Sequence, residues 1–322
     1  MKKEKIFRLS LGIAAGILLI LLGYFGYYYY LKLKQEVRPA YHAVPANSCA
    51  VLEVNGASVF WKNLNRQLIA KQLQKTDIFS GWFASIEKIN ALLLEDESFG
   101  KWIQEKQMLF SLHYRGEGNF SVLGALQLSN TAQQNNVHDF MQHHTSLSLI
   151  REQPEKLYQA EVNDSTRFFF AVSEGIFIVS MDQELLEQSL LFMKEDNHLL
   201  TQNSFQKVHK RRGENVSAHL FFNHKGFHRF LSMFAKKQFL SDFVEWSEYA
   251  GWAEMDLILE DGGMWFSGQA LLENPDDDFL RIFHGQKADK TGMTKILPAR
   301  TAILNYYGMD DFASFYSDYE KD

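Results

Sequence analysis

Apolar side chains follow one another almost without interruption from Leu9 to Leu31, and no charged residue occurs in this stretch. At a rise of about 1.5 Å per residue, a helix over these positions is long enough to cross a hydrocarbon core roughly 30 Å thick. The stretch ends in bulky aromatic residues, at 24–25 and 27–30, rather than in the small residues that a signal-peptide cleavage site requires. We therefore expect an uncleaved transmembrane anchor at 9–31, between a short basic tail (1–8) and a linker (32–42).

Two features of this anchor bear on its orientation and self-association. Four basic side chains precede the span and three follow it, a mild bias that favours an N-terminus inside and a body outside. Gly12 and Gly16 have the G-x-x-x-G spacing that lets two membrane helices approach closely, although small residues are ordinary in such helices. The sequence thus predicts a single-pass protein of a bacterial inner membrane with its body in the periplasm and Gly12 and Gly16 as a possible contact between copies.

The rest of the chain alternates short β-type runs with amphipathic helical segments, which predicts a soluble α+β body at 43–290. The strands are joined by turn sequences such as Ser173-Glu174-Gly175 and Asp261-Gly262-Gly263, so the sheet should be mainly antiparallel, with packed helices. We expect strands at 49–55, 108–114, 120–128, 157–162, 167–172, 176–181, 217–222, 252–260 and 264–272. We expect helices at 60–69, from 77, at 133–144, from 182, from 204 to Gly213, at 225–237 and at 276–283.

A short internal repeat divides the body. Residues 45–52 and 298–304 both read Pro-Ala-x-(Ser/Thr)-small and then continue into a β-rich run, and 217–223 is a fainter third copy. Each copy should be a strand leading into a helix, which suggests two related halves. For the segment 291–322 the repeat predicts a strand at 301–307 that pairs with the sheet, called the entry strand below, and a short terminal helix after it.

The entry segment Val44-Pro45-Ala46-Asn47-Ser48-Cys49-Ala50-Val51-Leu52, placed after an anchor and a short linker, resembles an uncharacterised family of single-span bacterial envelope proteins that carry a domain of unknown function. The stretch Leu200 to Val208, which leads to a strand and a helix, is similar to that family too. The resemblance covers about residues 40 to 320. It implies no catalytic residues.

Charge and composition exclude some classes of partner. Residues 1–34 hold six Lys or Arg and one Glu, a net of +5, so the remainder carries −11 of the total −6. A body with this balance should not attract nucleic acid or anionic lipid. Cys49 is the only cysteine, so no intramolecular disulfide can form, and its place in an apolar strand suggests an inert side chain.

Few residues suggest chemistry. His224 and His228 are four apart on a predicted helix, but Lys225 stands where a zinc protease has glutamate, and no third ligand is evident, so they are weak metal candidates. The chain contains no nucleophile elbow, P-loop or dinucleotide-binding glycine motif. The basic cluster at 207 and 210–212 is most simply explained by the dipole of a helix C-terminus that ends at Gly213. We predict no catalytic residue and no cofactor.

Three functions follow as hypotheses. The first is a membrane-tethered, non-enzymatic scaffold or interaction module with a protein partner. The second is a carrier or sensor of an apolar ligand, for which the 27 phenylalanines could line a cavity or simply fill the core. The third is a hydrolase whose active site is assembled from distant positions and is therefore invisible in the sequence.

Overall fold

The structure is a computed structural model that describes residues 21–27, 38–76, 80, 83–84, 87, 91, 96–116, 119–163, 166–233, 238, 246–260, 263–274, 278–287, 295, 297–298, 301 and 304–320. Residues 21–27 are helical. The remaining positions of the expected anchor, Gly12 and Gly16 among them, lie outside the described residues. Within the described ranges, no helix combines the length and the apolar character that crossing a membrane would require.

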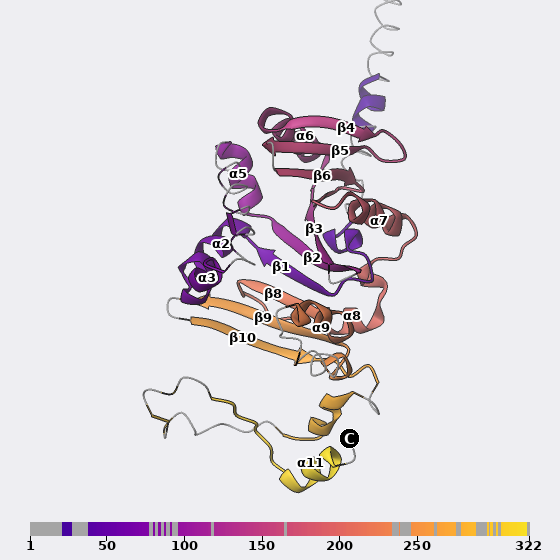
Figure 1. The fold of residues 1–322 in the computed structure, drawn as a ribbon. Helices are drawn as coiled ribbons and strands as arrows, with labels where there is room; N and C mark the ends of the chain where they lie inside the picture. Colours follow the sequence, from indigo (N-terminus) through magenta and orange to yellow (C-terminus); the bar gives the residue numbers. More distant parts are fainter. Residues whose placement is uncertain are drawn as a thin grey trace, which may run out of the picture. The chain divides into compact units, whose positions relative to one another are not determined.

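The body is α+β, as expected, with a large antiparallel sheet and packed helices (Figure 1). The strands pair in the order β10-β9-β8-β1-β2-β3-β7-β6-β5-β4. Their bounds are β1 Ala50–Asn55, β2 Gln107–Gly116, β3 Asn119–Gln127, β4 Ser146–Arg151, β5 Leu157–Asn163, β6 Thr166–Ser173, β7 Ile176–Ser180, β8 Ala218–Asn223, β9 Trp252–Glu260 and β10 Gly263–Ala270. The nine strands expected within residues 43–290 are therefore present, with small shifts of their ends, and β4 is an addition.

Turn chemistry explains how neighbouring strands reverse direction. Between β6 and β7, Glu174 and Gly175 have φ values of 50° and 76°. Two successive positive φ values belong to the tight hairpin turn whose twist matches that of the strands, and glycine adopts this conformation without steric cost. The predicted turn at Ser173-Glu174-Gly175 is thus confirmed. The Asp261-Gly262 turn lies outside the described residues.

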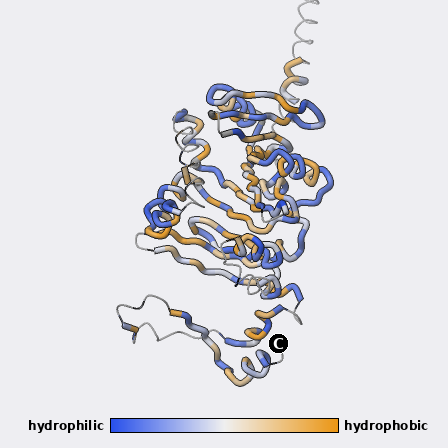
Figure 2. The backbone as a smooth tube through the Cα atoms, in the orientation of Figure 1, coloured by the Kyte–Doolittle hydropathy of each residue, from blue (hydrophilic) through white to orange (hydrophobic). Residues whose placement is uncertain are grey.

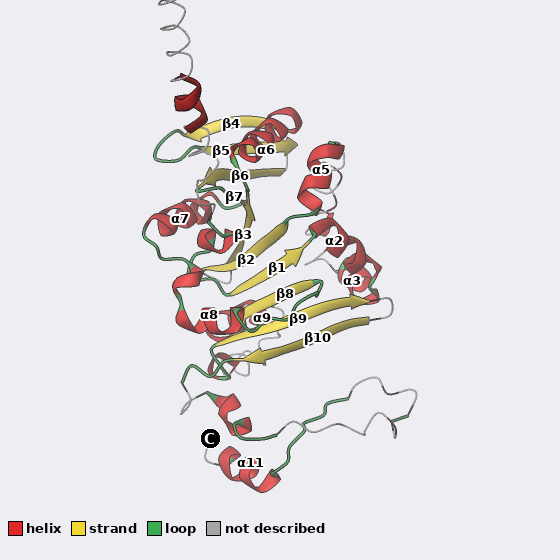
Figure 3. Cartoon of the chain, turned by 180° about the vertical axis from the view of Figure 1, so that it is seen from behind, coloured by secondary structure: helices red, strands yellow, loops and turns green. Residues whose placement is uncertain are grey.

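Helices connect and cover the strands. Their bounds are α2 Ala57–Arg66, α3 Leu68–Leu73, α5 Glu97–Gln104, α6 Thr131–His144, α7 Gln183–Lys194, α8 Asn203–His209, α9 His224–Ser232 and α11 Phe312–Tyr319, with 3-10 turns η1 Ala40–Ala43, η2 Leu199–Thr201, η4 Trp246–Glu248 and η5 Phe279–Phe283. Helix α7 packs against β6 and β7 (Figure 3). It begins as expected, because the Asp182 carboxylate accepts a hydrogen bond from the Leu185 N–H at 3.1 Å.

The chain forms two compact units, each built from separate stretches of sequence. The first comprises Met1–Pro45, Asn55–Phe110 and Val122–His198. Its core combines rings from α5, α6 and the strands β6 and β7: Phe99 and Phe140 stack at a centroid distance of 4.0 Å, and Phe170 lies 5.6 Å from Phe177. These four phenylalanines therefore belong to one buried apolar cluster.

The second unit comprises Ala46–Val54, Ser111–Ser121 and Leu199–Asp322. Phe205 of α8 packs edge-on against Phe221 of β8 and Trp252 of β9, with centroids 5.3 and 5.0 Å apart. The Trp252 side chain is fully buried, and its indole N–H donates to Gln202 at 3.1 Å. These contacts hold α8 over the sheet of this unit, beside the polar residues described below.

Three local expectations were wrong. The helix predicted at 60–69 is broken at Gln67 into α2 and α3, and Leu68 and Ile69, expected on its buried face, are 78% and 56% exposed. The helix predicted at 276–283 is only the 3-10 turn η5 in the described part of that range. The helix predicted to end at Gly213 ends at His209. Helical residue patterns alone do not determine where a helix breaks or ends, because most of a helix's stability comes from tertiary packing.

The predicted entry strand at 301–307 is also not observed. Among the described positions of that segment, Thr301 and residues 304–309 adopt no strand, and Leu304 and Tyr307 are 43% and 68% exposed. The segment instead ends in contacts with the chain after η5, where the Gln286 amide accepts from Asp310 N–H and donates to the Asp311 carbonyl. The short terminal helix is confirmed as α11, which Asp311 caps through the Ser314 N–H.

Candidate functional site

A row of polar side chains crosses the apolar sheet of the second unit. Glu53 of β1 lies opposite His219 of β8, and His219 lies opposite Asp256 of β9. Directly paired residues of antiparallel strands project to the same side, so the three share one face. Glu254 precedes Asp256 by two residues and joins them on that face. The side chains of Glu53, His219 and Glu254 are nearly inaccessible, with exposed fractions of 1–3% for the residues.

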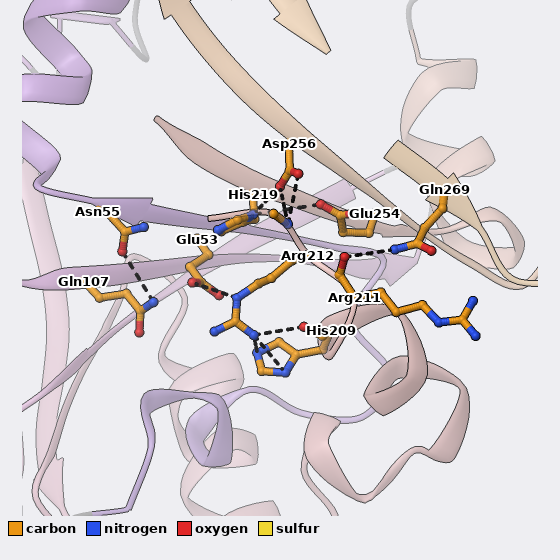
Figure 4. A network of polar contacts seen from close by, with 11 residues as sticks. Glu53, Asn55, Gln107, His209, Arg211, Arg212, His219, Glu254, Asp256 and Gln269 are labelled. Atoms are coloured by element: carbon orange, nitrogen blue, oxygen red, sulfur yellow. Dashed lines mark hydrogen bonds and ion pairs between the residues drawn. The ribbon is translucent and has the colours of Figure 1, made fainter. Parts of the chain in front are cut away.

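His219 and Asp256 form the centre of this group (Figure 4). The distance from His219 Nδ1 to Asp256 Oδ1 is 2.6 Å. The Gly213 N–H donates to the same carboxylate, at 3.0 Å from Oδ2. A Cβ on residue 213 would lie 2.2 Å from Asp256 Oδ2, closer than any real contact, so only glycine allows the main chain to approach the carboxylate this far.

Glu254 lies beside this pair with an unsatisfied oxygen. Its Oε1 is 3.8 Å from His219 Nδ1, buried, and without a hydrogen-bond partner. Burial, followed by the hydrogen bond and the charge of Asp256, raises the pKa of Glu254 to about 7. Two carboxyl groups so close cannot both ionise easily, because each charge opposes the other where water is excluded.

Arg212 supplies the nearest positive charge. Its Nε is 3.6 Å from Glu53 Oε1, and its Nη1 donates to the His209 carbonyl at 2.9 Å. The same guanidinium nitrogen lies 2.9 Å from Nε2 of the His209 ring. Burial and then the Arg212 charge lower the pKa of His209 to about 4, so its imidazole is neutral at pH 7. In Figure 4 the Arg212 side chain extends away from Asp256, toward Glu53 and His209.

The donor set of the cluster can hold a cation. One atom each from His219, Glu254 and Asp256 can be chosen so that all lie within 4.8 Å of one another. An imidazole nitrogen with two carboxylate oxygens is a recurrent ligand set for borderline divalent metals. The same groups could also transfer protons, since they join a histidine–aspartate pair to a carboxyl group whose pKa is raised to about 7.

The metal candidates from the sequence are not brought together with further ligands. His224 Nδ1 and the ring of His228 lie one helical turn apart, but His228 Nδ1 donates to the His224 carbonyl at 3.1 Å. The His224 ring packs between aromatic residues, and burial lowers its pKa. In the part of the chain that the structure describes, no cluster of three potential ligands includes either residue.

The other residues singled out by the sequence have structural roles. Cys49 is buried next to β1, and burial raises the pKa of its thiol, which fits an unreactive side chain. The basic cluster does not cap a helix ending at Gly213 as a whole: α8 ends at His209, and Arg212 lies beyond it, where it pairs with Glu53.

Sequence reasoning missed the cluster because its members come from three strands that are distant in the chain. A signal was nevertheless present, because each strand carries a charged or polar residue at an inward position of a largely apolar run: Glu53 in AVLEVN, His219 in AHLFFN, and Glu254 and Asp256 in WAEMDLILE. Because charged side chains are rarely buried without partners, such inward positions are expected to lie opposite one another in the sheet.

Comparison with known proteins gives little guidance. No protein-family model and no curated protein matches the chain. Among solved structures, it is similar to crystal form III of TP0453, at 12% identity and a TM-score of 0.38, over 76% of this chain and 84% of that one. For crystal form I of TP0453 the identity is 11% and the TM-score 0.40, over 77% and 84%. At these values the likeness identifies no family and carries no functional conclusion.

Proposed function

We propose that this chain is a membrane-tethered, non-enzymatic protein of the bacterial envelope that acts as a scaffold or interaction module. The observation that supports the tether is that residues 21–27 are helical and that Leu22, Tyr24 and Phe25 are 60–64% exposed. Figure 2 shows hydrophobic (orange) positions along this short helix. Apolar side chains as exposed as these are within the described part of the chain are suited to a lipid environment. This supports a transmembrane helix over Leu9–Leu31 as the anchor.

The proposed location is the bacterial inner membrane, with the N-terminus inside and the body in the periplasm. It is supported by the basic residues before the span and by the acidic balance of the body. Protease added to intact spheroplasts should degrade the body and spare an N-terminal fragment of about 40 residues, because only the short tail and the span would be protected. A body that resists protease until the inner membrane is lysed would contradict this orientation.

An interaction role is supported by the edge strand β10. Trp265 and Phe266 are adjacent on this strand and project to opposite sides, yet they are 61% and 54% exposed. β10 is the last strand of the sheet order in the described chain, so one of its backbone edges has no strand partner there. Exposed aromatic residues on an open edge are typical of protein-binding surfaces.

A photo-crosslinking amino acid at Trp265, introduced into the full chain in its own membranes, tests this role. We expect a discrete adduct with one protein. The matched control is the same probe at Leu191, which is 51% exposed on α7. If both positions give the same adducts, or if neither gives any, β10 is not a specific interaction surface.

The order of elements supports two related halves, the finer part of the proposed architecture. β1 leads into α2 and is followed later by the hairpin β2–β3, while β8 leads into α9 and is followed by the hairpin β9–β10. The first and third repeat copies in the sequence coincide with β1 and β8. The repeat that we propose therefore consists of the copies at β1 and β8, and the copy at 298–304 is left out. Self-association through Gly12 and Gly16 remains part of the proposal for the anchor.

A hydrolase with a dispersed active site is the second candidate, favoured by the convergence of His219, Glu254 and Asp256 from separate strands. A substrate would reach these residues poorly, because His219 and Glu254 are only 3% and 2% exposed, and this weakens the hydrolase candidate. Ester and phosphodiester chromogenic substrates, offered to the purified full chain and to Asp256→Asn, would separate the two candidates. Turnover by the native chain that Asp256→Asn abolishes would favour the hydrolase.

A further inference from the structure

We propose that His219, Glu254 and Asp256 bind one divalent transition-metal ion, for which Zn²⁺ is the appropriate probe. This site is independent of the proposed membrane tether and of the interaction through β10. A metal bound here would link β8 to β9 on the inner face of the second unit.

The geometry of the donor atoms allows a common ion. His219 Nδ1 lies 2.6 Å from Asp256 Oδ1 and 3.8 Å from Glu254 Oε1. Ligand atoms around a tetrahedral zinc at about 2.0–2.2 Å are roughly 3.3–3.6 Å from one another. The two observed distances lie on either side of this value, so changes of less than about 1 Å in each separation would create the site. Such changes are within reach of side-chain rotation.

A second observation points to a missing ligand. Glu254 Oε1 is buried and has no hydrogen-bond partner, although the residue is only 2% exposed and its carboxyl group is directed toward His219 (Figure 4). Leaving a buried polar oxygen without a partner costs free energy that native proteins ordinarily avoid. A cation between Glu254, Asp256 and His219 would satisfy this oxygen.

The ligand types indicate which cation fits. Two carboxylates balance the charge of a divalent ion, and the imidazole nitrogen favours Zn²⁺ or Fe²⁺ over Mg²⁺ and Ca²⁺, which prefer oxygen ligands alone. Three protein ligands leave a further coordination position open. The neighbouring Arg212 does not occupy this centre, because its guanidinium is drawn to Glu53 and His209.

Outer contacts would orient one of the ligands. The Gly213 N–H donates to the Asp256 carboxylate, at 3.0 Å from Oδ2 and 3.3 Å from Oδ1, and Oδ1 lies 2.6 Å from His219 Nδ1. Hydrogen bonds of this kind fix the direction of a metal-binding carboxylate. The alternative occupant of the same space is a proton shared between Glu254 and Asp256, and the experiment must distinguish the two.

The test uses the full chain in detergent micelles, purified without a histidine tag, stripped with a chelator and titrated with ZnCl₂ by calorimetry. We expect one ion per chain. Asp256→Asn and Glu254→Gln keep the size and shape of the side chains while removing a charged ligand, and each should weaken binding by more than about tenfold. The control is the double variant His224→Gln, His228→Gln, which removes two other histidines of the same unit and should bind as the native chain does.

Cobalt absorption gives a second readout that does not depend on variants folding. Co²⁺ added to the native chain should produce the visible bands of a low-symmetry nitrogen and oxygen site, without thiolate charge transfer, and Zn²⁺ should displace it. The proposal is overturned if the native chain takes up no stoichiometric Zn²⁺, or if it takes up Co²⁺ only with octahedral aqua-like bands. Binding that survives Asp256→Asn but is lost in the His224, His228 variant would overturn it as well.

Discussion

At the scale of single residues, the buried polar row depends on a few side chains that must fit closely. Glu53, His219 and Glu254 are held in an interior where a charge without partners would be very unfavourable. Glu53 and His219 are tolerated because Arg212 approaches Glu53 and because Asp256 accepts from both His219 and the Gly213 N–H, whereas Oε1 of Glu254 has no hydrogen-bond partner. Removing one partner should therefore cost more than removing an exposed ion pair.

Gly213→Ala tests the close approach of the main chain to Asp256. The added Cβ would meet Asp256 Oδ2 at 2.2 Å, so the loop or the carboxylate must move and the N–H bond must lengthen. We expect a loss of about 1–3 kcal/mol in the free energy of unfolding, measured by urea denaturation. Gly263→Ala on β10 is the control, because its Cβ would find no atom nearer than 3.6 Å. Equal effects of the two variants would show that the approach to Asp256 is not tight.

His209 should make the second unit sensitive to acid. Its pKa is about 4 in the folded chain, lowered by burial and by Arg212 and His219, against an ordinary value of 6.5. Between these two pH values the unfolded chain binds more protons at this position, so stability rises with pH from about 4 to 6.5 and is then constant. Because the ring is partly exposed, we expect a contribution on the order of 1 kcal/mol.

Unfolding measured from pH 4 to pH 7 checks this expectation. His209→Gln should flatten the rise in stability over this interval, because it removes the titrating ring. His143→Gln on the exposed side of α6 is the control for replacing a histidine. A native profile without any rise between pH 4 and 6.5, or a rise that His209→Gln leaves intact, would contradict the prediction.

At the scale of elements, most strands and several helix ends were predictable, because they depend on local residue patterns. Period-two runs and turn residues located both strands of the β6–β7 hairpin, and Asp182 marked the start of α7. β4 was missed although residues 146–149 alternate between serine and leucine, because four of its six residues are exposed and none is buried, so that no apolar face of the strand joins the core. The break at Gln67 could not be foreseen, since helical periodicity continues through it while the packing does not.

Asp182→Ala should destabilise the first unit by about 1 kcal/mol, because the Leu185 N–H at the start of α7 would lose its acceptor. Thermal unfolding followed by circular dichroism is a suitable measurement. Glu195→Ala, at the opposite end of the same helix, removes an exposed side chain and is the matched control. Should both variants melt together with the native chain, the cap would not contribute to stability.

At the scale of the whole molecule, the sequence repeat predicted that strands lead into helices. It did not predict which stretches of the chain make up each compact unit. Each compact unit takes three separate stretches of chain, so residues such as Glu53 and Asp256 share a unit across some 200 positions. No short-range pattern records such a pairing. For this reason the α+β class could be predicted from local periodicity, whereas the buried cluster, which exists only through strand order and register, could not.

The chain end provides the last test, because the structure reverses the expectation drawn from its sequence. Residues 304–309 form no strand, and none of the α11 side chains is buried. Among the described residues, the chain end forms exposed hydrogen bonds to Gln286 and Lys287, and the ring centroid of Phe315 lies 5.3 Å from that of Phe283. Exposed contacts of this kind contribute little to stability because water replaces them readily.

Deleting the chain from residue 304 onward should therefore shift the melting temperature by no more than about 2 °C. Phe205→Ala, which removes a fully buried ring, should lower it by several times that amount. A comparable loss from the deletion would mean that the terminal segment packs on the body more extensively than its exposed residues indicate.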